Sequence, residues 1–253
     1  MKLVRIPTGQ FIMGDANGLP DERPPARVSI DRSFWMGACE VTNAQYHRFD
    51  PDHDSGYFTK RFRGPDGPGL SLGGPEQPVV RVSWERAMAF CRWLSRRMDA
   101  HFTLPTEAQW EYACRAGSRS ALSYGDVDAD FSPWANVADK ALSVPPKPTG
   151  GLESNIVAYF GKGILESKVY GGNILCDLRF DDGAVATANV GSYQPNAWGL
   201  HDMHGNAAEW TRTTYRVYPC RTDDGRDDPA DSGRKVVRGG SWRDLYSLRL
   251  DEI

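Results

Sequence analysis

No long apolar run occurs in this sequence, and this absence excludes a transmembrane helix, which needs about 20 consecutive apolar residues. The first residues, MKLVRIPTGQF, also lack the apolar segment of a signal peptide. With a net charge of -3 and no basic run, the sequence gives no reason to expect nucleic acid or a membrane as a partner. We therefore expect a cytoplasmic protein whose ligand is a peptide, a protein or a small molecule.

Cysteine is scarce, widely spaced and odd in number, with 5 residues and no CxxC pair. This pattern argues against a disulfide framework and against a zinc site. Cys91 and Cys114 fall on apolar faces of predicted helices, where a small buried thiol is the usual interpretation. A reducing compartment is the default for such a chain.

Three helices have clear start signals. Thr42 with Gln45, and Thr106 with Gln109, form capping boxes that predict two helix starts. The range Ser83–Met98 is the clearest helix, because its apolar residues recur at steps of three and four and form one stripe. Cys91 lies within that stripe.

The rest of the chain predicts short strands and much loop, in keeping with 26 glycines and 17 prolines. Strands are expected within residues 3–14, at 26–30 and at 34–36. Residues 169–178 contain apolar residues but are interrupted by two glycines, so we expect an irregular insertion around 138–180. The elements together predict an α+β domain.

The tract Gly199–Trp210, GLHDMHGNAAEW, combines acidic, amide and glycine residues at high density. Asp202 and Glu209 offer charged oxygens, and Gly205 allows a tight turn between them. Ca²⁺ takes six to eight oxygen ligands from carboxylates, amides and carbonyls, so a calcium loop is one interpretation. A glycine-rich surface turn with a helix beginning near Asn206 is the other, since the spacing is not that of an EF-hand.

Together with motifs elsewhere, this tract resembles the central signature of the formylglycine-generating-enzyme (sulfatase-modifying factor) family. The resemblance covers residues 3–244 and implies a single domain, 1–253, with a C-type-lectin-like fold, low regular secondary structure and long ordered loops. The motifs stand in this order: Phe11–Gly14 (FIMG), Phe34–Tyr46 (FWMGACEVTNAQY), Pro78–Trp84 (PVVRVSW), Leu104–Gly117 (LPTEAQWEYACRAG), Trp134–Val137 (WANV), Gly191–Leu200 (GSYQPNAWGL) and Val236–Trp242 (VVRGGSW).

The resemblance implies a first calcium site within the signature tract. Its ligands are the side chain of Asp202, the carbonyls of Gly205 and Ala207, and the side chain of Glu209. The family usually has asparagine at the first of these positions. Aspartate retains the oxygen and adds a negative charge, which favours a divalent cation.

A second calcium site is implied across the predicted insertion. It consists of the Asn136 side chain, the Val137 carbonyl, the Asp182 side chain and the Ala184 carbonyl. The alternative for Asn136 and Asp182 is ordinary Asx-turn chemistry, in which the side chain caps its own loop.

The catalytic centre of the family has no counterpart in this sequence. The family oxidises a substrate cysteine to formylglycine with two cysteines just after the GGS turn, and its aerobic members use copper. Here those positions hold Asp244 and Arg249, and neither offers the soft sulfur ligand that Cu(I) prefers. We therefore predict no catalytic residue, no copper and no formylglycine generation.

The resemblance leaves three functions open. The first is a calcium-stabilised binding or accessory module, in which Tyr193, Trp198 and Trp242 line a groove or pack in the core. The second is an oxygen-dependent oxidoreductase of the same superfamily, and the third is a lectin-fold variable ligand-binding protein. Family domains also close with a further strand beyond Ile253, so a closing strand is apparently missing and an open sheet edge is expected.

Overall fold

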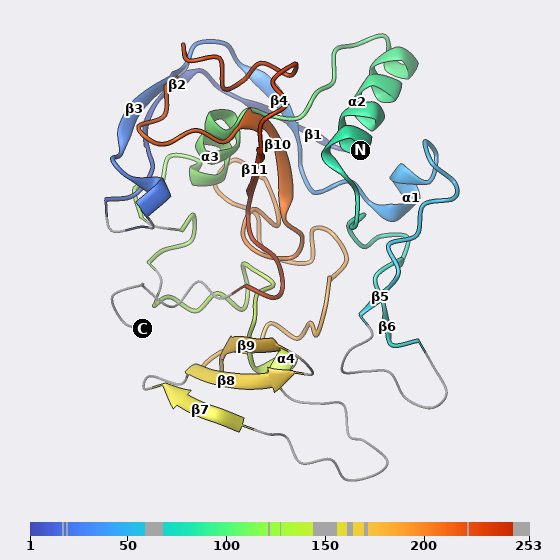
Figure 1. The fold of residues 1–253 in the computed structure, drawn as a ribbon, viewed down its shortest axis with the longest axis vertical. Helices are drawn as coiled ribbons and strands as arrows, with labels where there is room; N and C mark the ends of the chain where they lie inside the picture. Colours follow the sequence, from blue (N-terminus) through green and yellow to red (C-terminus); the bar gives the residue numbers. More distant parts are fainter. Residues whose placement is uncertain are drawn as a thin grey trace.

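The fold is seen in a computed structural model. It describes residues 1–16, 18, 20–58, 68–120, 122–126, 128–143, 156–160, 164–169, 172–221 and 223–244. Strands are short and helices few, as the sequence predicts (Figure 1).

The N-terminal region forms two antiparallel pairs. Strand β1 (Leu3–Ile6) pairs with β4 (Phe34–Gly37), and β2 (Gly9–Met13) pairs with β3 (Ala26–Ile30). Burial alternates along these strands and ends on a fully buried Ile6 in β1. The strands predicted in this region are confirmed.

The three predicted helices are present, and two of them begin at the predicted caps. Helices α1 (Asn43–Tyr46) and α3 (Glu107–Arg115) both start with complete capping boxes, and α2 (Trp84–Met98) starts after the Ser83 cap. Such caps satisfy backbone N–H groups that the first helical turn leaves without partners. The minor elements are a 3₁₀ turn at Pro20–Glu22 and the strand pair β5 (Tyr57–Phe58) and β6 (Leu70–Ser71).

Helix α3 lies at the centre of the core. Its Trp110, Ala113 and Cys114 are buried, in agreement with the sequence, and they pack with Ile6 of β1 among others. Strand β10 (Glu209–Thr214) and strand β11 (Lys235–Arg238) form an antiparallel pair beside it.

One ion-pair network ties α3 to β11. Nη2 of Arg238 donates to Glu111 Oε2 at 2.6 Å, and Nη1 lies 3.6 Å from Glu107 Oε1. The Arg238 guanidinium also lies over the Trp110 ring at 5.5 Å from its centroid. The network holds two buried carboxylates of α3 next to a cation from the end of the described chain.

Helix α2 departs from its predicted packing. Met88 and Phe90 are its buried residues, and Phe90 stacks on Tyr46 of α1 at 5.4 Å between ring centroids. The predicted stripe is only half-buried at Cys91, and Met98 at its end is 60% exposed. The stripe is only half-buried because a cavity lies against Ala87, Cys91 and Leu94.

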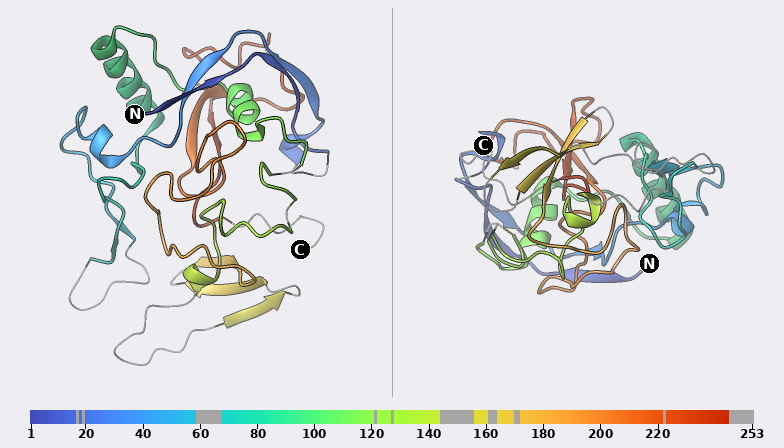
Figure 2. Two further views of the ribbon diagram at one scale, coloured as in Figure 1. Left: turned by 180° about the vertical axis from the view of Figure 1, so that it is seen from behind. Right: turned by 90° about the horizontal axis from the view of Figure 1, so that it is seen from below.

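A three-stranded meander lies at the end of the molecule opposite α2 (Figures 1 and 2). It comprises β7 (Ile156–Phe160), β8 (Ile164–Val169) and β9 (Gly172–Asp177), with α4 (Lys140–Ser143) beside β9. The backbone N–H of Asp177 donates to the Ala138 carbonyl at 2.9 Å, which joins the sheet to the core. Regular structure is thus present within the range 138–180.

The three aromatic residues considered for a groove pack inside the protein. Tyr193 and Trp242 are each 8% exposed, and Trp242 contacts the Phe58 ring at 4.7 Å between centroids. Trp198 packs on Tyr112 at 4.9 Å. No helix in the described ranges is long and apolar enough to cross a membrane.

Candidate calcium loops and the α2 cavity

The loops of the two predicted calcium sites touch each other. Asn136 and Gly205 form an isolated parallel bridge, and the N–H of Asn206 donates to the Asn136 carbonyl at 2.7 Å. Gly205 has φ +78°, and a Cβ there would collide with the Asn136 backbone. Only glycine fits this approach.

Asn206 is the central link between these loops. Its Nδ2 donates to Glu40 Oε1 at 2.9 Å, and its Oδ1 accepts from Asn136 Nδ2 at 3.1 Å and from the Ala188 N–H at 2.9 Å. No helix starts here, because Asn206 lies in a bend of left-handed backbone with φ +55°. The alternative of a helix beginning near Asn206 is therefore wrong.

The first predicted site brings a buried acid, Asp202, next to a half-buried one, Glu209. Oδ2 of Asp202 accepts from the Gly191 N–H at 2.6 Å, and the carboxyl group also hydrogen bonds to that of Glu40. Glu209 Oε2 accepts from Trp110 Nε1 at 2.7 Å. Burial, opposed by that bond and aided by the charge of Asp202, raises the pKa of Glu209 to about 7.

Glu40 belongs to the same acidic group, although the sequence did not single it out. Its pKa is raised well above the usual range by burial and then by the charges of Asp202 and Glu209. Its carboxyl group hydrogen bonds to the carboxyl group of Asp202, so the two acids share a proton when no cation is present. The only signal in the sequence was its place inside the motif FWMGACEVTNAQY, which says nothing of its neighbours in space.

The residues of the second predicted site lie close together, and the Asp182 carboxylate caps its own loop as the Asx-turn alternative expects. Oδ2 of Asp182 accepts from the Val137 N–H at 2.9 Å and Oδ1 from the Ala184 N–H at 2.8 Å. Asn136 is fully buried; its Nδ2 donates to the Ala186 carbonyl at 2.9 Å and its Oδ1 has no partner among the described residues. Asp139 stands nearby, and burial followed by the Asp139 charge raises the pKa of Asp182 to about 7.

These donor sets fit calcium better than a transition metal. Across the described ranges, no group of three or more His, Cys, Asp or Glu side chains is arranged to hold a metal ion. A cation here would depend on carbonyl and amide oxygens, which are ligands of Ca²⁺. Asn136 Oδ1 is buried without a donor, and the Asp202 carboxyl faces a second acid, Glu40, so a cation would supply a favourable interaction at each place.

The neighbouring histidine His204 is engaged elsewhere. Its Nε2 accepts from the Ser123 N–H at 3.1 Å and lies 3.5 Å from Cys114 Sγ. Burial lowers its pKa to about 4, so the ring is neutral near pH 7.

The turn after β11 contains Asp244, at the position of the first family cysteine. Its Oδ2 accepts from both the N–H and the hydroxyl of Ser241, at 2.7 and 2.8 Å. Its carbonyl accepts from the Ala138 N–H at 2.9 Å. Asp244 thus forms a capped turn, and Arg249 lies outside the described residues.

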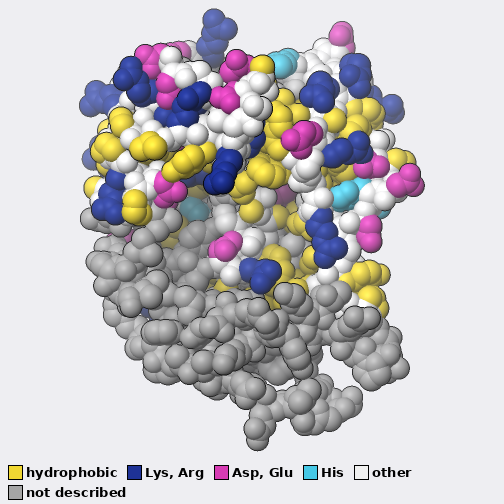
Figure 3. Space-filling view, viewed as in Figure 1, with side chains coloured by type: hydrophobic (Ala, Val, Ile, Leu, Met, Phe, Trp, Pro, Cys, Tyr) yellow, Lys and Arg dark blue, Asp and Glu magenta, His cyan; other side chains and the backbone are white. Residues whose placement is uncertain are grey.

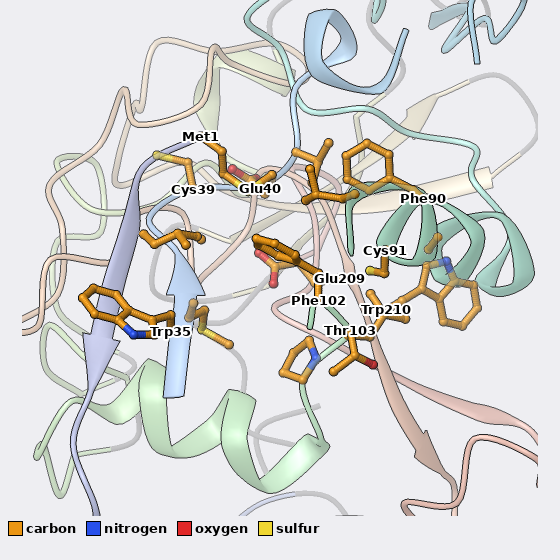
Figure 4. A pocket seen from close by; sticks show the side chains of 18 of the residues that line it. Met1, Trp35, Cys39, Glu40, Phe90, Cys91, Phe102, Thr103, Glu209 and Trp210 are labelled. Atoms are coloured by element: carbon orange, nitrogen blue, oxygen red, sulfur yellow. The ribbon is translucent and has the colours of Figure 1, made fainter. Parts of the chain in front are cut away.

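A cavity of about 880 Å³ lies between β4, α2 and β10, and we call it the α2 cavity. Figure 3 shows hydrophobic side chains gathered on this face beside α2. Figure 4 shows Phe90 and Cys91 of α2 on one side of the cavity, and Glu40 and Glu209 reaching it from other segments. The sequence did not predict this cavity.

Comparison with known proteins supports the resemblance. The family profile for the sulfatase-modifying factor enzyme 1-like domain matches residues 1–251. The formylglycine-generating enzyme of Bos taurus is 30% identical over 284 residues, covering 95% of this chain and 66% of that protein. The Streptomyces coelicolor enzyme is 28% identical, with 97% of this chain and 81% of that protein covered. The inactive C-alpha-formylglycine-generating enzyme 2 of Bos taurus is 30% identical, with 96% and 77% covered.

Solved structures agree on the fold. PvdO from Pseudomonas aeruginosa matches with a TM-score of 0.60 at 25% identity, covering 97% of this chain and 84% of that chain. Treponema denticola variable protein 1 matches with a TM-score of 0.64 at 19% identity, covering 98% and 86%, which shows a shared fold alone. The chain therefore belongs to the sulfatase-modifying factor (formylglycine-generating enzyme) family and has its fold.

Proposed function

We propose that this chain is a calcium-stabilised binding or accessory module that does not generate formylglycine. The observation that carries this proposal is the turn at Asp244, where a carboxylate stands at the position of the first family cysteine. That carboxylate accepts two hydrogen bonds from Ser241. A hard oxygen ligand in a capped turn supplies neither a redox thiol nor a soft site for copper.

Cysteines elsewhere do not replace the missing pair. Cys39 and Cys91 both line the α2 cavity, but burial raises the pKa of each thiol to about 11. Burial also raises the pKa of Cys114 to about 12 and that of Cys220 to about 11. The thiolate is the nucleophile and the metal ligand, so these protonated thiols are poor candidates for either role.

Calcium is proposed for the two loops joined at Asn136 and Gly205. Asp202 is buried and Glu209 is half-buried, and neither has an ion pair in the described chain. A divalent cation would offset the cost of keeping them ionised. When bound, the ion would supply charge and hold the loops. The protein's own part is to position the oxygens.

The relatives are consistent with a non-catalytic role. An inactive relative and an active one are both 30% identical to this chain. Overall sequence identity therefore does not distinguish active from inactive members of the family. The proposal depends instead on the residues after the GGS turn. Two alternative functions remain, an oxygen-dependent oxidoreductase and a variable ligand-binding protein. The fold of this chain is similar to that of the Treponema variable protein, which bears on the second alternative.

The test is a formylglycine assay. The protein is incubated with a peptide carrying the CxPxR motif, oxygen, copper and a reductant, and the aldehyde is sought by mass spectrometry. The Streptomyces coelicolor enzyme serves as the positive control. We expect no aldehyde above the protein-free blank. Turnover proportional to protein concentration, persisting after repurification, would overturn the proposal.

A further inference from the structure

The side chain of Asn206 lies between the two proposed calcium sites. It is fully buried, and its Oδ1 accepts from Nδ2 of Asn136, a proposed ligand of the second site, at 3.1 Å. Its Nδ2 donates to Glu40 Oε1 at 2.9 Å, and the Glu40 carboxyl group hydrogen bonds to that of Asp202, a proposed ligand of the first site. One amide group thus connects the residues of both sites.

Asn206 also sets the orientation of the Asn136 amide. Asn136 Nδ2 donates to two acceptors, Asn206 Oδ1 and the Ala186 carbonyl, the second at 2.9 Å. Because these acceptors hold the amide nitrogen, Asn136 Oδ1 points elsewhere and is buried without a donor. An oxygen of the second site is therefore aimed by a residue that belongs to the first loop.

A backbone segment connects the same two sites. It begins at Asp182, a proposed ligand of the second site, and the N–H of its Ala188 donates to Asn206 Oδ1 at 2.9 Å. It ends at Gly191, whose N–H donates to Asp202 Oδ2 at 2.6 Å. Asn206 holds the middle of this segment, so order at one end restricts the other end.

The charges of the two sites allow both to be filled. The carboxyl groups of Glu40, Asp202 and Glu209 interact at the first site, and those of Asp139 and Asp182 interact at the second. When all of them are ionised, their formal negative charge exceeds the positive charge of two divalent cations. Attraction to the carboxylates therefore offsets the repulsion between the two ions.

We propose that Asn206 is a positioning residue that couples the two sites, so that calcium at either site raises the affinity of the other. Calcium at one site holds its own loop in a single conformation, and the contacts of Asn206 impose that order on the second loop. The other site then binds its ion without paying the same cost in conformational entropy. The factor of coupling is the same in both directions, as thermodynamic linkage requires.

The inference rests on the proposed calcium-stabilised role and deepens it. Its test is a calorimetric titration of the chelator-treated full chain with calcium, below its melting temperature. Asp182→Asn removes the charged ligand of the second site, so its titration gives the affinity of the first site alone. Glu209→Gln removes the charged ligand of the first site and gives the affinity of the second.

The quantity that measures coupling is a ratio of association constants. We expect the product of the two wild-type constants to exceed the product of the two single-site constants about tenfold. Asn206→Gly keeps the left-handed backbone, φ +55°, and removes the side chain. Measured in that background with the same two substitutions, the ratio should fall to about threefold or less.

The matched control is Asp99→Gly. Asp99 is also left-handed, with φ +47°, but it is exposed at the end of α2 and lies outside both loops. In this background the ratio should stay near that of the wild type. A merely structural role for Asn206 would lower stability in Asn206→Gly and leave the ratio unchanged.

Three results would overturn the inference. They are a wild-type ratio of one or below, binding of fewer than two ions, and an Asn206→Gly ratio equal to that of the wild type. Two independent sites remove the coupling and leave the calcium-stabilised role in place, whereas no calcium binding at all removes both. If Asn206→Gly does not fold, the wild type and the two single-site variants still decide whether the sites are coupled.

Discussion

The Asn136 carbonyl occupies the space that a Cβ on Gly205 would need. This contact joins the two loops that were predicted separately as calcium sites, and it leaves no room for any side chain at position 205. The backbone at Gly205 also has φ +78°, a conformation that favours glycine.

We expect Gly205→Ala to be among the most damaging single substitutions. Its matched control is Gly117→Ala, which has φ +90° but nothing within 4 Å of the added Cβ. The control should cost about 1–2 kcal/mol, the usual penalty for left-handed backbone. Gly205→Ala should cost about 4 kcal/mol or more, because the Asn136 backbone must also move. Urea denaturation measures both, and equal costs would show that the contact is unimportant.

Removal of calcium should destabilise the protein. A ligand that binds only the folded state adds about 2.7 kcal/mol at 100 times its dissociation constant. For a chain of this size that corresponds to roughly 5–10 °C in melting temperature. We expect EDTA to lower the melting temperature by this amount and excess calcium to restore it.

A pair of substitutions locates that calcium effect. Glu209→Gln should reduce the response to EDTA, because it removes a charged oxygen from the first site. Glu76→Gln, at an exposed position, should leave the response intact. A melting curve that EDTA does not change would count against calcium, and an equal response in both variants would count against Glu209 as a ligand.

Acid should destabilise the protein partly through His204. Its folded pKa is about 4 and its unfolded pKa about 6.5, so the stabilising contribution of the neutral ring is complete above pH 6.5. It is lost as pH falls toward 4, by up to about 3 kcal/mol. In His204→Gln this part of the pH dependence should vanish, while contributions from carboxylates remain. Parallel stability curves for the two proteins between pH 6.5 and 4 would contradict the assignment.

The half-buried Arg238, which pairs with two buried carboxylates, should matter far more than a surface arginine. Arg238→Met leaves Glu107 and Glu111 of α3 without that ion pair, and breaking a buried pair from one side costs about 3–5 kcal/mol. Arg86→Met removes an exposed pair with Asp50, which solvent screens, and should cost much less. Chemical denaturation of both variants gives the comparison. Similar losses would mean that burial adds nothing to the Arg238 network.

Local features of the fold could be predicted from the sequence. The starts of α1 and α3 follow from Thr42 and Thr106, because a cap is decided by residues within one turn of the helix. Helix α2 follows from its apolar periodicity. The meander β7–β9 was missed, since its strands are short and two glycines interrupt the apolar pattern. The fold itself was predicted from the order of the family motifs along the chain. Apolar periodicity predicts single helices and strands but not how they are arranged in space.

Only part of the candidate site could be predicted from the sequence. The ligand set around Asp202 and the one around Asn136 were each named, yet their contact through Gly205 depends on how the loops fold back. Glu40 and the α2 cavity were missed for the same reason: Glu40 meets Asn206, which is 166 residues away along the chain. The calcium itself, the absence of copper, the single-domain boundary, the missing closing strand and the cytoplasmic location stay predictions.

The ion pair between Glu111 and Arg238 also sets an order of events during synthesis. The two residues are 127 positions apart, so at 5–20 residues per second α3 leaves the ribosome roughly 6–25 seconds before Arg238 does. Until then Glu111 has Arg115 of its own helix as its ion-pair partner. Throughout that interval the nascent chain carries acidic groups on a helix that belongs in the core. The contact between α3 and Arg238 can therefore form only after β11 has emerged, late in synthesis of the described chain.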